Sequence, residues 1–307
     1  MKRDLVSIHD LSRQEVADIT ALGAMVKANP EAYSDALAGK TLGMIFQKSS
    51  TRTRVSFQVG IYQLGGMGLF LSSKDIQLGR GEPLSDTAQV LSRYMDGIMA
   101  RTFAHSDVTT LATYASIPVI NGLTDLLHPC QALADVLTIR EHFGRCDGLK
   151  MTYIGDGNNM AHSLMFAASK AGMDFACAAP TGYWMDTEVV AQGQADADAA
   201  GTSLVQTTSI EEAVAGADVV YTDVWASMGQ EDESKQRIKD FEGFCVDARV
   251  MSQADPKAIF LHCLPAHRGE EVSAEVCDGP QSIIFEQAEN RLHAQKAIML
   301  RLMGAQG

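Results

Sequence analysis

The chain has 307 residues, of which 46% are hydrophobic and 21% are charged, so it can form a core large enough for two domains. Its 25 lysines and arginines are outnumbered by 38 aspartates and glutamates, which gives a formal net charge of −13. Such a charge repels nucleic acid and anionic membranes, and no apolar run approaches the length of a membrane span. Neither nucleic acid nor a membrane is therefore expected as a partner.

The N-terminus and the cysteines indicate the compartment. Met1-Lys2-Arg3 is followed at once by Asp4, and no apolar segment typical of a signal peptide comes next. The six cysteines are scattered, without a Cys-x-x-Cys pair. In a chain of this length, that pattern favours reduced thiols, and we expect a cytoplasmic protein.

The first predicted elements are a helix and a strand. Ser12-Arg13-Gln14-Glu15 is a capping box, and the helix that it opens should end near Asn29, because Pro30 follows. The short apolar run over residues 41–46 is typical of a buried strand.

A run of hydroxyl and guanidinium groups, Ser49-Ser50-Thr51-Arg52-Thr53-Arg54, lies between this strand and the next predicted helix. The start of a helix presents unpaired N–H groups and the positive end of the helix dipole, and arginine forks add to both. The run predicts a site for phosphate or a similar dianion, although a Ser/Thr cap followed by solvated arginines is the alternative. The helix should end at Gly65-Gly66. The apolar residues of this amphipathic run are Val55, Phe57, Val59, Ile61 and Leu64.

Short strands and helices then alternate. Strands are expected at 68–71, 97–101 and 118–121, and helices at 86–95, 107–115 and 132–143. The polar, glycine-rich segment 72–83 is either a lid or a surface loop. Arg101 ends its strand at the edge where open α/β sheets bind ligands. His128 directly precedes a helix and can either cap it or donate to a carbonyl oxygen.

A second α/β series begins at Lys150, with strands expected at 151–154, 174–179, 203–207, 219–224 and 259–263. The segment from Gly155 to Met160 is similar to a dinucleotide-binding fingerprint. It departs from that pattern where Met160 replaces the third glycine, and where Ala179-Pro180 replaces the acid that would bind a ribose. A nicotinamide-dependent dehydrogenase is therefore not favoured.

Two further polar segments follow strands of this series. The segment 223–229 offers the Asp223 carboxylate and the Ser227 hydroxyl, which suit an ammonium group. The segment 262–269 contains Cys263 and two histidines, but a proline within it and the lack of a second Cys/His cluster make zinc improbable. The chain closes with a helix over 288–302, with Arg291 near its start.

Taken together, these segments resemble the carbamoyltransferase family over essentially the whole chain. Ser-Thr-Arg-Thr-Arg and His-Pro-x-Gln are typical of the family in general. Gly-Asp-Gly-Asn-Asn-Met-Ala-His-Ser, Asp-x-Trp-x-Ser-Met-Gly-Gln-Glu and His-Cys-Leu-Pro-Ala-His-Arg-Gly resemble its ornithine-using branch. The resemblance implies two doubly wound, mainly parallel α/β domains, 1–144 and 145–307, with helix 288–302 packing back on the first. It also implies an active site in the cleft between them.

By this resemblance, the protein transfers the carbamoyl group of carbamoyl phosphate to the δ-amine of L-ornithine, without a metal or organic cofactor. It would form a homotrimer with shared active sites. The alternatives are a carbamoyltransferase that uses putrescine, N-acylated ornithine or aspartate, and a non-catalytic protein that binds an amino acid or phosphate. Carbamoyl transfer places negative charge on a carbonyl oxygen and then on phosphate, so it needs fixed donors and cations.

The resemblance also assigns roles to individual residues. Arg52, Arg101, His128 and Cys263 would take part in the reaction. Residues that contact carbamoyl phosphate would be Ser50, Thr51, Arg52, Thr53, Gln77 from a neighbouring subunit, Arg101, His128, Gln131, Cys263, Leu264 and Arg291. Residues that contact ornithine would be Asn159, Asp223, Ser227 and Met228. The sequence departs from the family pattern at Gln47 and Ser49, where glutamate and proline are common.

Overall fold

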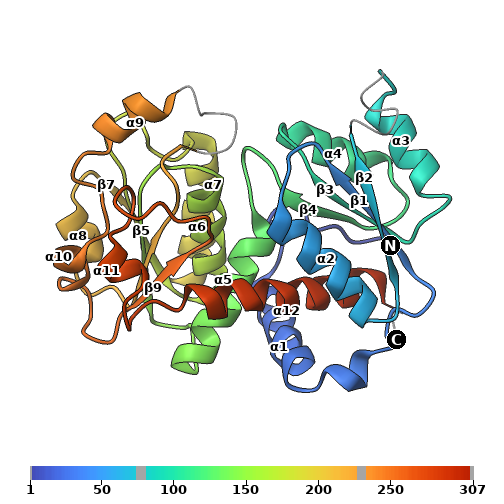
Figure 1. Cartoon of the computed structure of the whole chain (residues 1–307), viewed down its shortest axis with the longest axis horizontal. Coiled ribbons are helices and arrows are strands. Elements are labelled where there is room, and N and C mark those ends of the chain that lie inside the picture. Colours follow the sequence, from blue (N-terminus) through green and yellow to red (C-terminus); the bar gives the residue numbers. More distant parts are fainter. Residues whose placement is uncertain (1, 74–80, 227–232, 305–307) are drawn as a thin grey trace. The chain divides into compact units, whose positions relative to one another are not determined.

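The computed structural model describes residues 2–73, 81–226 and 233–304. The chain divides into two compact units, unit 1 with Met1–Leu137 and Asn290–Gly307, and unit 2 with Thr138–Glu289. Each unit is built around one parallel β-sheet that carries helices (Figure 1). The prediction of an α/β protein with two doubly wound parallel sheets is confirmed.

The sheet of unit 1 has four strands in the order β2-β1-β3-β4, and all neighbouring pairs are parallel. The strands are β1 (Thr41–Phe46), β2 (Met67–Ser72), β3 (Gly97–Arg101) and β4 (Val119–Leu123). The central strands β1 and β3 are almost entirely buried, which explains why their sequences are continuous apolar runs.

The helices of unit 1 form two groups. The first, α3 (Leu84–Leu91) and α4 (His105–Tyr114), shares a core with β1, β3 and β4. The second contains α1 (Arg13–Ala28), α2 (Thr51–Gln63) and parts of α5 (Pro129–Phe143) and α12 (Ile284–Met303), while η1 (Pro30–Tyr33) follows α1. A Cβ atom at Gly23 would lie 3.1 Å from Leu137 Cδ2 and 3.6 Å from the His293 carbonyl oxygen. Helices α1, α5 and α12 therefore approach closely at a glycine.

The sheet of unit 2 has five parallel strands in the order β7-β6-β5-β8-β9. They are β5 (Lys150–Ile154), β6 (Asp174–Ala178), β7 (Leu204–Thr207), β8 (Val219–Thr222) and β9 (Ile259–His262). The chain winds outward from β5 to one edge and then returns to β8 on the other side. The loops after β5 and β8 thus flank the switch point where open α/β sheets bind ligands.

Helices cover the sheet of unit 2 on two sides (Figure 1). On one side lie α6 (Asn159–Ala171) and α7 (Thr187–Ala200), and on the other lie α8 (Ile210–Val214), α10 (Ala248–Met251) and α11 (Ala274–Cys277). Helix α9 (Ser234–Asp240) follows the loop after β8. In the described ranges, no helix is both long and apolar enough to cross a membrane.

Several predicted boundaries are wrong. Helix α3 covers 84–91 rather than 86–95, strand β8 ends at Thr222, and α5 begins at Pro129, since proline is favoured in the first turn. In helix α2, Val55 and Val59 are 52% and 37% exposed. The buried residues of α2 are Thr53, Phe57, Gly60 and Ile61. Their spacing of three and four residues defines one helix face, which the alternating apolar residues do not.

Candidate active site

The N-terminus of α2 lies at the carboxyl edge of the sheet of unit 1. Phe46, the last residue of β1, is in register with Arg101, the last residue of β3. The Ser50 side chain caps α2, its Oγ accepting the N–H of Thr53 at 3.2 Å. Arg52 is exposed on the first turn, whereas Thr53 is buried. The positive end of the helix dipole and the Arg101 guanidinium therefore belong to the same edge.

Two guanidinium groups converge on the hydroxyl of Thr53. Arg291 Nη2 donates to Thr53 Oγ1 at 2.9 Å, and Arg101 Nη1 donates to it at 3.5 Å. The two arginines are only 4% and 5% exposed. Arg291 comes from α12, 238 residues after Thr53, so α2, β3 and α12 together build one buried cationic cluster.

His128 belongs to the same cluster. Burial lowers the pKa of its imidazole well below the usual value, and the positive charges of Arg291, Arg101 and Arg52 lower it further. The imidazole is therefore neutral at neutral pH and can donate a hydrogen bond without carrying a charge. The charges of these three arginines therefore bear on the His128 imidazole.

Gln131 presents an acceptor in the first turn of α5. Its Nε2 donates to Asp135 Oδ1 at 2.8 Å, which fixes the orientation of the side-chain amide. The opposite atom, Oε1, is buried and accepts no hydrogen bond from any residue that the structure describes. Asp135 thus leaves Gln131 with an oxygen that is suited to an N–H of a ligand.

Gln47 anchors the segment before α2. Its Nε2 donates to Asp107 Oδ2 at 2.8 Å, its Oε1 accepts the N–H of Phe103 at 3.0 Å, and its own N–H donates to the Arg101 carbonyl at 2.9 Å. A glutamate at this position would face the Asp107 carboxylate. The departure from the family pattern is therefore matched by a local partner, while Ser49 is simply exposed.

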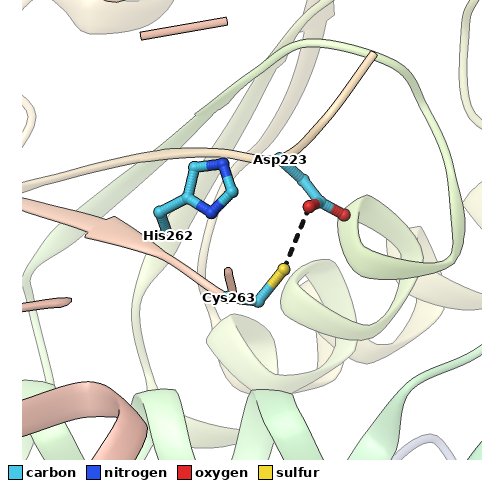
Figure 2. Close-up of side chains that lie close together, drawn as sticks. All are labelled: Asp223, His262 and Cys263. Carbon is cyan, nitrogen blue, oxygen red and sulfur yellow. Dashed lines mark hydrogen bonds between the residues drawn. The ribbon is translucent and has the colours of Figure 1, made fainter. Parts of the chain in front are cut away.

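Unit 2 carries a buried carboxylate. Asp223 follows β8, and its Oδ1 accepts the S–H of Cys263 at 3.0 Å and the N–H of Val224 at 2.9 Å. Figure 2 shows the thiol and the carboxylate facing each other, with His262 beside them. Burial raises the pKa of the carboxyl, and the thiol hydrogen bond opposes that rise. Among the described residues no lysine or arginine pairs with it, so the site suits an ammonium group from a ligand.

The loop after β5 lies at the same edge of this sheet. Asn158 caps α6, its Oδ1 accepting the N–H groups of Met160 and Ala161 at 2.8 and 3.3 Å. A Cβ atom at Gly157 would lie 2.3 Å from the backbone nitrogen of Met185. Close packing of two loops therefore explains this glycine without a bound pyrophosphate. Asn159 is the first residue of α6.

Two side-chain groups in the described ranges have ligand atoms within 4.8 Å of one another, the spacing of a metal site. In Asp223, His262 and Cys263, both imidazole nitrogens of His262 already have protein partners. In His267, Glu270 and Glu271, one oxygen of Glu271 accepts the backbone N–H of His267 and contacts His262 Nε2. Neither group has a full set of open donors.

The structure brings some of the predicted residues together, by unit. In unit 1 Arg101 and Arg291 donate to Thr53, and their charges and that of Arg52 lower the pKa of His128. In unit 2 Asp223 contacts Cys263. Leu264 follows Cys263 with a backbone φ of 61°. The predicted residues Gln77, Ser227 and Met228 lie outside the described residues.

Sequence reasoning missed Arg237. Its Nη1 donates to Asp156 Oδ2 and to the Trp225 carbonyl, both at 2.8 Å, so it joins the loops after β5 and β8. The side chain is almost buried, although its helix is rich in charged residues and has the composition of a solvated surface helix. Composition therefore offered no signal for this residue.

Each of the two units matches a known protein-family model, and the whole chain matches individual proteins. Residues 3–141 match the family model of the aspartate/ornithine carbamoyltransferase carbamoyl-P binding domain, and residues 147–302 match that of the Asp/Orn binding domain. The chain therefore belongs to the aspartate/ornithine carbamoyltransferase family.

Individual relatives match along the whole chain. An ornithine carbamoyltransferase of Oceanobacillus iheyensis is 57% identical over 98% of this chain and 94% of its own length. One of Thermococcus kodakarensis is 55% identical over 98% of this chain and 96% of its own. The solved structure of the ornithine carbamoyltransferase from Pyrococcus furiosus has a TM-score of 0.95 and 51% identity, covering 98% of this chain and 97% of that one.

Replacing Thr53 by valine tests the cationic cluster. The substitution removes the acceptor that two buried guanidinium groups share, so we expect the affinity for inorganic phosphate to fall about tenfold. Isothermal titration calorimetry measures this, with Thr113→Val, at an exposed threonine on α4, as the control that should bind like the wild type. Unchanged phosphate affinity in a folded Thr53→Val variant would contradict the role of Thr53 in orienting the arginines.

Proposed function

We propose that the protein transfers the carbamoyl group of carbamoyl phosphate to the δ-amine of L-ornithine, giving L-citrulline and phosphate. The observation that carries the proposal is the presence of two buried sites of opposite charge. Unit 1 holds the cationic cluster around Thr53, which suits a phosphate dianion, and unit 2 holds the Asp223 carboxylate, which suits an ammonium. The ornithine carbamoyltransferases of similar length described above support the same activity.

The chemistry needs these groups rather than a nucleophilic side chain. The δ-nitrogen attacks the carbamoyl carbon, a C–N bond forms, and the C–O bond to phosphate breaks with its electron pair on the phosphate. The attacking nitrogen loses one proton and the departing phosphate gains one, so the products are neutral urea-type citrulline nitrogen and hydrogen phosphate. Negative charge gathers first on the carbonyl oxygen, to which neutral His128 donates, and then on phosphate, which Arg52 and Arg101 stabilise. Holding both substrates together supplies much of the remaining acceleration, and no metal or organic cofactor is required.

We assign the substrates to the two domains, with a boundary near residue 144. Carbamoyl phosphate is bound by Ser50, Thr51, Arg52, Thr53, Gln77, Arg101, His128, Gln131, Cys263, Leu264 and Arg291. Ornithine is bound by Asn159, Asp223, Ser227 and Met228. In this assignment Asp223 pairs with the α-ammonium, and Cys263 with Leu264 receives the δ-amine. The buried Gln131 oxygen supports its contact with the carbamoyl NH₂ group.

Other acceptors fit the Asp223 site less well. Putrescine lacks the α-carboxylate that a loop built around an amino acid would bind. An N-acylated ornithine has no α-ammonium to pair with the buried carboxylate of Asp223. Ornithine satisfies both requirements, which is why it is the acceptor proposed here.

Citrulline formation tests the proposed function. Purified protein is given carbamoyl phosphate and, in parallel, L-ornithine, putrescine, N-acetylornithine or L-aspartate, and the carbamoylated product is quantified. We expect kcat/KM for ornithine to exceed that for each other acceptor by about 100-fold or more. N-acetylornithine leaves the buried carboxylate unpaired, putrescine lacks the α-carboxylate, and aspartate has no δ-amine. Equal or better use of another acceptor would replace ornithine as the substrate.

Asp223→Asn tests the acceptor assignment. Loss of the counter-ion should raise KM for ornithine about 100-fold, while KM for carbamoyl phosphate changes little. Steady-state kinetics with each substrate varied in turn measures this. Asp198→Asn, at an exposed aspartate of α7, serves as the matched control and should behave like the wild type. An equal rise in both KM values would show that Asp223 does not select the acceptor.

We further propose that the protein is a cytoplasmic homotrimer. None of its six cysteines, all within the described ranges, forms a disulfide. Edge strand β2 and helix α2 both carry exposed apolar side chains that a second copy would cover, and these residues are Val55, Val59, Tyr62, Met67, Leu69 and Phe70. Exposed apolar side chains in such number are typical of a protein–protein interface. The number three and the sharing of sites rest on the family resemblance.

Mixing two inactive variants tests the shared site. Arg52→Ala and Gln77→Ala proteins are dissociated, combined in equal amounts and reassociated. If Gln77 completes the site of the next subunit in a closed ring, random mixing makes about a quarter of all sites wild type. Activity should therefore return in proportion to the hybrid trimers separated by a charge tag. Verified hybrids that stay inactive would show that Gln77 does not act across the interface.

A further inference from the structure

The buried imidazole of His262 holds the backbone of a proposed substrate contact. His262 ends β9 and is 1% exposed. The backbone N–H of Leu264 donates to its Nδ1 at 2.8 Å. An imidazole nitrogen that accepts a hydrogen bond carries no proton, so the ring proton lies on Nε2. Nε2 in turn donates to Glu271 Oε1 at 3.2 Å.

Glu271 fixes the far side of this ring. Its side chain is fully buried, and Oε1 also accepts the backbone N–H of His267. The backbone N–H of His262 donates to Gln287 Oε1 at 2.9 Å, and Gln287 Nε2 donates to the Tyr221 hydroxyl at 3.1 Å. The imidazole is therefore held at its backbone and at both ring nitrogens, and it cannot turn without breaking several buried hydrogen bonds.

The hydrogen bond from the Leu264 N–H to His262 Nδ1 lies where the backbone is strained. Leu264 has φ 61°, in the left-handed region that branched residues rarely adopt. Such a conformation persists only where the surroundings hold it. Cys263, between His262 and Leu264, donates its thiol hydrogen to Asp223 (Figure 2). The directions of the thiol and of the Leu264 carbonyl thus depend on the same short segment.

We infer that His262 is a positioning residue for carbamoyl transfer, whose neutral imidazole holds the Leu264 backbone and so sets Cys263 Sγ and the Leu264 carbonyl where the δ-amine is received. The inference rests on the proposed function and deepens it. A purely structural role, in which His262 only supplies a partner for the buried Glu271 carboxylate, is the alternative that the experiment must separate.

Two substitutions divide the functions of the two ring nitrogens. The side-chain oxygen of asparagine can occupy the place of Nδ1, so His262→Asn keeps the acceptor for Leu264 and loses the donor to Glu271. The side-chain nitrogen of glutamine can reach the place of Nε2, so His262→Gln keeps the donor to Glu271 and loses the acceptor. Each variant therefore removes one bond and serves as the matched control of the other.

If His262 positions the segment, the variants His262→Gln and His262→Asn rank in one order by activity and in the opposite order by stability. His262→Gln should lower kcat/KM for ornithine about 10- to 100-fold, because small misplacements of reacting groups are costly. Its affinity for phosphate, bound in unit 1, should stay within about twofold of the wild type. His262→Asn should lower Tm by about 5 °C, because a buried carboxylate loses a partner, yet remain the more active variant. If the role of His262 is purely structural, the variant with the lower Tm also has the lower activity. That result would overturn the inference.

A second measurement does not depend on turnover. The alkylation rate of Cys263 by iodoacetamide, followed by peptide mass spectrometry, should rise at least about tenfold in His262→Gln and little in His262→Asn, since only the former releases the segment. Equal rates in the two variants would overturn the inference. Wild-type protein that makes no citrulline overturns the proposed function instead, and the alkylation rates still decide whether His262 holds the segment.

Glu271→Gln covers the case in which a histidine variant does not fold. It leaves the bond between Leu264 and His262 in place, so kcat/KM should stay within about threefold of the wild type even if Tm falls. A folded Glu271→Gln protein that loses as much activity as expected for His262→Gln would show that the buried charge, rather than the Leu264 contact, matters for the reaction.

Discussion

Buried positive charge in unit 1 is the constraint on which the proposed site depends. Arg101 and Arg291 are almost removed from solvent and share one hydroxyl, that of Thr53, in a chain whose net charge is −13. A guanidinium group that is buried loses the stabilisation that water gives to its charge. A bound anion compensates for this loss, so the buried arginines favour anion binding. The helix N-terminus capped by Ser50 adds its dipole at the same edge. The proposed recognition of phosphate thus rests on where these charges are buried.

Unit 2 carries a buried negative charge, whereas unit 1 carries buried positive charge. The two units therefore suit ligand groups of opposite charge. Asp223 is buried, and burial raises the pKa of its carboxyl, so the charged form costs free energy until a cation arrives. An ammonium group stabilises the charged form, and the Cys263 thiol already donates to it. One protein therefore holds a site that favours a dianion and another that favours a cation. A reaction between carbamoyl phosphate and an amino-acid amine needs both.

Local sequence patterns predicted the elements better than the contacts between them. The parallel strands and the N-cap at Ser50 follow from apolar runs and capping chemistry, which act within a few residues. The bond between Arg291 and Thr53 joins residues 238 positions apart, and only the resemblance placed them together. Glu271 and Arg237 were missed because a charged residue in a polar segment usually lies at the surface.

The neutral state of His128 connects these charges to the chemistry. Its pKa is lowered first by burial and then by the three arginines. A bound phosphate dianion offsets the field of the arginines, so that part of the depression weakens when carbamoyl phosphate binds, while the part due to burial remains. In the proposed reaction, the imidazole therefore stays an uncharged donor and stabilises the developing oxyanion through a hydrogen bond instead of giving up a proton. The proposed role of the arginines, which always carry charge, is to stabilise the departing phosphate.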